Sequence, residues 1–241
     1  MVLDESVTVS AAVVGIGMRT FFSIQHIKSA VLFANFAVDE QKRMVAESDY
    51  ANKSKLHAFV CASIFFSAAF LEATANELFA ESQDGLSQTA IELDEKGLFF
   101  LSALAASDLH DKASVLDKFD LFLAANQKKI DRSDSFYENV NLVIKLRNAL
   151  VHYKASWLDV GSDSSFIRSG SLYESRLWKN LSKKFDITGK FPQPYNDWLS
   201  AYCAKFVVDA VIEFNDEVFV QLNSKSFIDH LKSELKVSMI S

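Results

Sequence analysis

Three polar residues near the middle of the chain have the chemistry needed to handle a phosphate. Asn148 directly follows Arg147, and His152 comes five positions after the arginine. A guanidinium is always charged and presents planar donors that suit a phosphate or carboxylate oxygen. An imidazole gains or loses a proton near neutral pH, so it serves as a general base or acid. These residue types, so spaced, could bind an anion and transfer a proton.

The segment from Ser135 to Lys154 that carries them is predicted to form one helix, capped by Ser133 or Ser135. Its apolar residues recur at helical spacing and indicate a core-facing stripe: Phe136, Val140, Val143 and Leu150. Arg147 falls on the same stripe. Because a guanidinium keeps its charge, a buried Arg147 must have a partner.

The predicted partner is Glu72, on a helix expected from Ser54, as N-cap, to Ala80. A stripe on this helix places a carboxylate and an amide among apolar residues: Phe65, Ala69, Glu72, Asn76 and Phe79. A buried carboxylate without a cation is strongly unfavourable. We therefore expect Glu72 and Arg147 to pair across the bundle. The alternative is that Glu72 points to solvent near a loop.

The run from Arg147 to His152 resembles the signature motif of the HEPN family of helical domains. The run from Phe70 to Leu78 is similar to an early helix of several HEPN subfamilies. The resemblance implies an all-α fold, an antiparallel HEPN-like helical bundle. In that family the Arg/His pair serves cleavage of RNA without a metal.

The resemblance also implies roles for the site residues. His152 would take a proton from a ribose 2′-OH or give one to the leaving 5′-oxygen, while Arg147 would hold the scissile phosphate. Asn148 would orient one of these groups, and Tyr153 or Lys154 would help to hold the RNA backbone. The products would be a 2′,3′-cyclic phosphate and a 5′-hydroxyl, with no metal and no cofactor.

The spacing of the pair bears on the oligomeric state. Five residues correspond to about 140° around a helix, so Arg147 and His152 do not share one face. Two subunits related by a two-fold axis could bring both copies of each residue into one cleft. The resemblance implies such a homodimer with a composite site. A toxin or effector in a stress or anti-phage system, with an antitoxin or regulatory partner, is the role expected from it.

Other interpretations stay open. Arg147 could be a structural charge in the core, with His152 a cation that offsets the helix dipole. The chain would then be a non-catalytic HEPN-like module that binds a partner protein or a nucleotide. A second pair, Arg19 and His26, has similar spacing. The pair at Arg147 is preferred because Asn148 and an apolar stripe accompany it.

The composition predicts a single domain over residues 1–241. The chain is 49% hydrophobic with only 2 Pro and 7 Gly, so few turns interrupt its elements. Its 21 Phe residues are expected to fill the core. Residues 156–194 hold both prolines and are predicted to be an irregular insertion or loop region before a last long helix at 196–222. Helices are also expected at 19–46, 91–106 and 115–130.

The charge distribution favours one region for an anionic partner. The net charge of −6 argues against broad nonspecific binding of nucleic acid. Between Asn141 and Lys190, however, nine Lys and Arg stand against four Asp and Glu. A phosphate backbone would approach this segment. A basic loop exposed to solvent is the other interpretation.

The chain is expected to be cytoplasmic and not to enter a membrane. The longest apolar run, Ala58 to Leu71, is shorter than the roughly 20 residues that span a bilayer. Acidic residues, not the basic ones of an export signal, precede the N-terminal apolar segment. Cys61 and Cys203 are interpreted as buried thiols in a reducing compartment. His110 is interpreted as a surface histidine, because no second histidine or cysteine lies at metal-ligand spacing.

Overall fold

The computed structural model describes residues 20–49, 53–84, 94–107, 112–152, 158–160, 166–168, 181, 184 and 198–238. These residues form an all-α bundle, as predicted, with one short pair of antiparallel strands. The helices are α1 (Ser23–Glu47), α2 (Ser54–Asp84), α3 (Glu95–Ala106), α5 (Val115–Ala125), α6 (Ser135–Val151) and α8 (Ala201–Gln221), followed by a 3-10 turn at Asp229–Leu231.

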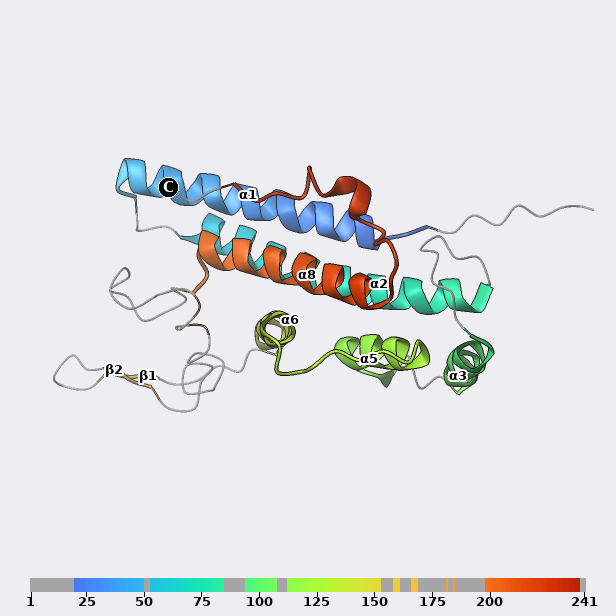
Figure 1. The fold of residues 1–241 in the computed structure, drawn as a ribbon. Coiled ribbons are helices and arrows are strands. Elements are labelled where there is room, and N and C mark those ends of the chain that lie inside the picture. The colour runs from blue at the N-terminus through green and yellow to red at the C-terminus, as the bar shows by residue number, and fades with distance from the viewer. Residues whose placement is uncertain are drawn as a thin grey trace, which may run out of the picture.

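The bundle is built around α2, which contacts α1, α3, α5, α6 and α8. α1 and α2 run in opposite directions, and α8 lies alongside both (Figure 1). α5 and α6 lie on the side of α2 and α8 that faces away from α1, and α6 is seen nearly end-on in Figure 1. The axis of α6 therefore crosses the axes of the long helices. This crossing brings the C-terminal half of α6 against the middle of α2.

Aromatic residues fill much of the core, as the composition predicts, although several Phe residues are exposed, among them Phe22 and Phe99. Phe70, Phe119, Phe214 and Phe219 are among the largest fully buried side chains. The ring of Phe214, on α8, contacts the rings of Phe119 on α5 and Tyr137 on α6. The helix predicted at 19–46 is confirmed as α1, and its apolar residues at helical spacing are buried: Ile27, Val31, Ala34 and Val38.

The face of α2 that carries Glu72 is not the core face that the sequence predicts. Phe65 is 39% exposed, the Glu72 side chain is 47% exposed and Asn76 is exposed. The buried side instead carries other apolar residues: Val60, Ile64, Leu71, Ala75 and Leu78. Because several helices already cover the other sides of α2, Phe65 and the polar residues Glu72 and Asn76 lie on the side that stays open.

The helix starts and ends differ in detail from the predictions. The N-cap of α6 is Asp134, not Ser133 or Ser135. Ser54 is the first residue of α2, not its N-cap, and α2 continues to Asp84, beyond the predicted end at Ala80. In the predicted insertion, β1 (Leu158–Val160) pairs with β2 (Phe166–Arg168). Most of 156–194 and His110 lie outside the described residues.

Among the described residues, α2 is the one helix long and apolar enough to cross a membrane, over Ser54–Ser82. The sequence-based expectation considered only Ala58 to Leu71 and so missed the length of this segment. Half of its most apolar window is buried in the bundle. A core helix surrounded by other helices has this same composition, so the apolar length of α2 is explained by packing.

The two cysteines match their interpretation as unpaired, buried thiols. Cys203 is fully buried and Cys61 is half-buried, and neither forms a disulfide. Burial raises the pKa of both thiols. Because the thiolate is the reactive form, neither cysteine is poised for nucleophilic chemistry.

Candidate functional site

Arg147 lies in the open, not in the core. The buried residues of α6 are Tyr137, Val140, Leu142, Val143 and Leu146, whereas Arg147 and Asn148 are exposed. The prediction that Arg147 is a buried charge is therefore wrong. Its Nη1 donates a hydrogen bond to Asn148 Oδ1 at 3.0 Å. No carboxylate in the described part of the chain pairs with it.

The apolar stripe of α6 reaches Arg147, but the neighbouring helix does not close over it. The facing part of α2 carries alanines, among them Ala68, Ala69 and Ala73. Small side chains leave an open space where larger ones would fill the contact. Helical periodicity correctly places Arg147 on the face of α6 that points toward α2. Because the α2 residues there are small, this face lines a pocket and not a closed contact.

Glu72 has a cation partner, as predicted, but the partner is Lys118 of α5. Lys118 Nζ forms an ion pair with Glu72 Oε1 and donates to Asn76 Oδ1 at 2.9 Å. The predicted pair between Glu72 and Arg147 is therefore wrong. The Lys118 side chain is only 4% exposed. Its buried ammonium needs an anion, and Glu72, one helix away, supplies it.

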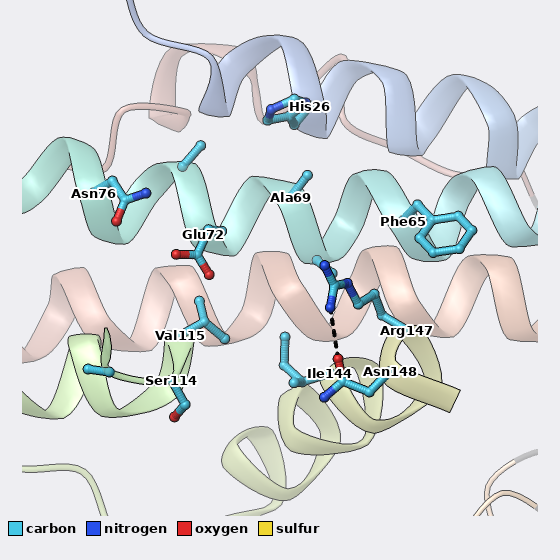
Figure 2. Close-up of a pocket in the computed structure, with 13 residues that line it drawn as sticks. His26, Phe65, Ala69, Glu72, Asn76, Ser114, Val115, Ile144, Arg147 and Asn148 are labelled. Atoms are coloured by element: carbon cyan, nitrogen blue, oxygen red, sulfur yellow. Dashed lines mark hydrogen bonds between the residues drawn. The ribbon is translucent and has the colours of Figure 1, made fainter. Parts of the chain in front are cut away.

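The pocket brings four of the predicted site residues together: Glu72, Asn76, Arg147 and Asn148. It has a volume of about 650 Å³. Residues from four parts of the chain line it: His26; Phe65, Ala68, Ala69, Glu72, Ala73 and Asn76; Ala113, Ser114 and Val115; Ile144, Arg147 and Asn148. Figure 2 shows Arg147 and Asn148 on α6, across from Glu72 and Asn76 on α2. The site is thus a pocket between α2 and α6 with a cation on one wall and a carboxylate on the other.

His152 does not line this pocket. It is exposed and follows α6 as its C-cap residue, where its backbone N–H donates to Asn148 O at 2.9 Å. The predicted separation of about 140° from Arg147 accounts for this placement. Tyr153 and Lys154, predicted to hold the RNA backbone, lie outside the described residues.

Two residues at the site were not predicted: His26, which lines the pocket, and Lys118, which does not line it but binds Glu72 and Asn76. His26, set aside as half of an accidental pair, lines the pocket and lies 6.2 Å from the Phe22 ring and 6.0 Å from the Phe66 ring, centroid to centroid. Lys118 holds the side chains of Glu72 and Asn76, which form the wall of the pocket on α2. A signal for Lys118 was present in the sequence, since it shares a helix face with Val115 and Phe122. No sequence signal connects His26 with α6, because the pocket that both line depends on the packing of whole helices.

Within the described ranges, no group of three or more His, Cys, Asp or Glu could hold a metal ion. The polar side-chain groups that the pocket offers include a guanidinium, two amides, an imidazole and a carboxylate, which accepts hydrogen bonds. This set suits hydrogen bonding to an anion and to a polar ring edge.

Comparison with family models, with curated proteins and with solved structures gave no match for this chain.

Proposed function

We propose that this chain is a HEPN-like, metal-independent endoribonuclease that works as a homodimer. The observation that carries the proposal is the exposed guanidinium of Arg147, which is held by Asn148 and is not neutralised by any described carboxylate. An exposed, oriented and unneutralised guanidinium is suited to a phosphate. The proposed role is that of a toxin or defence effector in the cytoplasm.

The reaction follows from the residue types. One imidazole takes the proton from a ribose 2′-OH, and the resulting alkoxide attacks the adjacent phosphorus. The bond from phosphorus to the 5′-oxygen then breaks, and a second imidazole gives that oxygen a proton. Arg147 offsets the negative charge that builds up on the phosphate oxygens. The products are a 2′,3′-cyclic phosphate and a 5′-hydroxyl.

The dimer supplies the second imidazole. One subunit has a single His152, and it lies about 140° around the helix from Arg147. A two-fold axis beside the end of α6 would bring both copies of His152 and Arg147 to one RNA strand. One copy of His152 then acts as the base and the other as the acid.

The test is cleavage of RNA by the purified chain in excess EDTA, with analysis of the termini. We expect cyclic phosphate and 5′-hydroxyl ends. Arg147→Ala should lower the rate about 100- to 1,000-fold, because a charge-stabilising group is lost. His152→Ala should lower it roughly 100- to 10,000-fold, because proton transfer is lost.

Two control variants separate these effects from a general change of charge. Lys225→Ala removes a positive charge at an exposed position after α8, outside the basic segment from Asn141 to Lys190. His230→Ala removes an exposed histidine near the C-terminus. Both should cleave at the wild-type rate. Activity that EDTA abolishes, or that survives His152→Ala, would rule out the proposed mechanism.

A second candidate is a non-catalytic helical module that binds a nucleotide or a partner protein. The placement of His152 outside the pocket favours it, because within one subunit Arg147 has no imidazole from the predicted pair beside it. Binding of RNA that depends on Arg147 but leaves the RNA intact would support this module.

A further inference from the structure

The Lys118 ammonium fixes the orientation of two groups on α2. It is buried and can only donate hydrogen bonds, so each of its partners must offer it an oxygen. Glu72 offers Oε1 and Asn76 offers Oδ1. The amide of Asn76 cannot be reversed without placing its NH₂ group against the ammonium. Lys118 therefore holds both side chains in one arrangement.

This arrangement leaves one acceptor and one donor free beside each other. Glu72 Oε2 and Asn76 Nδ2 have no partner in the ranges that the structure describes. Both side chains are accessible, since Glu72 is 47% exposed and Asn76 is exposed. The wall of the pocket on α2 thus presents a fixed hydrogen-bonding edge to any molecule that enters.

The space in front of this edge has the size of a small ligand. Its volume of about 650 Å³ lies within the range of roughly 300 to 1,000 Å³ found for such sites. Ala69 and Ala73 keep it open, and Arg147 and Asn148 stand across from the edge (Figure 2). An anion near Arg147 and a planar polar group near Glu72 could occupy the pocket together.

We propose that the pocket is a nucleobase-binding subsite that selects guanine. Glu72 Oε2 would accept from the ring N–H and amino group of guanine, and Asn76 Nδ2 would donate to the neighbouring carbonyl oxygen. A phosphate of the same strand would contact Arg147. Uracil offers one N–H between two carbonyl oxygens, which the carboxylate repels. Adenine and cytosine place an unprotonated ring nitrogen beside their amino group, so they too fit the carboxylate less well.

The subsite rests on the proposed function in that it assigns a base preference to the same RNA site. It is tested without cleavage, by titrating the full chain with each of the four ribonucleoside 5′-monophosphates in a calorimeter. We expect guanosine monophosphate to bind roughly 10- to 100-fold more tightly than the other three, the range that one bidentate base contact gives. Glu72→Gln should abolish this preference, because an NH₂ group replaces the free acceptor.

Two further variants keep the test decisive if Glu72→Gln destabilises the chain by leaving Lys118 without an anion. Lys118→Met removes the buried charge and keeps the carboxylate. Its preference for guanosine monophosphate should be weaker than that of the wild type and stronger than that of Glu72→Gln. Glu138→Gln makes the same chemical change at an exposed position on α6 and should bind like the wild type. Equal binding of all four nucleotides by the wild type, no binding, or an unchanged preference in Glu72→Gln would overturn the subsite.

The two proposals fail separately. Selective binding of guanosine monophosphate without any cleavage of RNA would overturn the ribonuclease and keep the subsite. Cleavage that depends on Arg147 and His152, with no preference for a base and no change in Glu72→Gln, would overturn the subsite and keep the ribonuclease.

Discussion

Two arginines of this chain stand in opposite situations. Arg43 donates to Glu40 at 2.7 Å and also pairs with Glu47 and Asp49. Its charge is neutralised within its own helix and the residues just after it. Arg147 instead has only the neutral amide of Asn148 beside it in the described structure. The charge of Arg147 is therefore available to an external anion, whereas the charge of Arg43 is not.

Glu40 shows what full pairing does to a carboxylate. Its side chain is 4% exposed, and Lys55 Nζ lies 3.0 Å from its Oε2 in addition to the contact with Arg43. The hydrogen bonds from Arg43 and then from Lys55 lower the pKa of Glu40 to about 2 from its usual 4.5. A lowered pKa in the folded state means that the ionised form stabilises the fold.

This shift predicts how stability depends on pH. The contribution of Glu40 is fully present above pH 4.5 and is lost as the pH falls from there through about 2. The melting temperature of Glu40→Gln should lie below that of the wild type at pH 7, and the gap should shrink over that window. Melting curves measured by circular dichroism at several pH values test this. A gap that stays constant down to pH 2 would contradict it, and Glu47→Gln, at a 57% exposed side chain, should give a smaller gap.

At the scale of elements, α5 is the helix that positions Lys118. It begins at a reciprocal cap: Ser114 Oγ accepts from the Asp117 backbone N–H at 3.3 Å and donates to Asp117 Oδ2 at 2.6 Å. These bonds satisfy a free donor at the helix start. Since Ser114 also lines the pocket, the cap joins the stability of α5 to the geometry of the site.

Ser114→Ala should therefore lower the free energy of unfolding by about 1 kcal/mol. Urea denaturation at neutral pH measures this change. Ser107→Ala is the matched control, because it removes an exposed hydroxyl that donates to the Leu104 carbonyl at the end of α3. If the free energy of unfolding falls no more than in the control, the cap does not stabilise the fold.

The elements themselves could largely be predicted from the sequence. Helical spacing of apolar residues located α1, α2, α5, α6 and α8 to within a few residues. The N-cap of α6 was harder to predict, because Ser133, Asp134 and Ser135 are consecutive and all three residues favour the N-cap position. The open face of α2 was wrongly predicted to be a core face. Alanines are compatible with either environment, so the neighbouring helices must be known to choose between them.

At the scale of the whole molecule, α5, α6 and α8 meet at the Phe214 ring, where Phe119 lies at 5.1 Å and Tyr137 at 6.0 Å between ring centroids. This contact fixes α6 relative to α5, and so fixes Arg147 relative to Lys118. Within one subunit the arrangement completes the pocket but leaves His152 beside it. The proposed reaction therefore depends on a second copy of the chain.

A mixing experiment tests this dependence. If both copies of His152 work in one cleft, refolding the wild type together with an excess of His152→Ala should lower the activity of each wild-type chain. Most wild-type chains would then be in mixed dimers that hold one His152 in place of two. Sedimentation should give twice the chain mass of 27.0 kDa. A fully active monomer, or mixed dimers with one His152 that are as active as the wild type, would contradict a composite site.

The sequence by itself determined that the chain folds as helices, because the spacing of apolar residues and the scarcity of Gly and Pro depend only on the local chain. It also placed Arg147 and Asn148 on one helix and indicated that the arginine and histidine point in different directions, although the helix ends at Val151 and His152 is its C-cap. Only the tertiary structure decided which charges meet. Glu72 and Lys118 are 46 positions apart. Periodicity tells which side of a helix is apolar, but packing chooses the neighbour that covers it, so a pocket lies where a buried ion pair was expected.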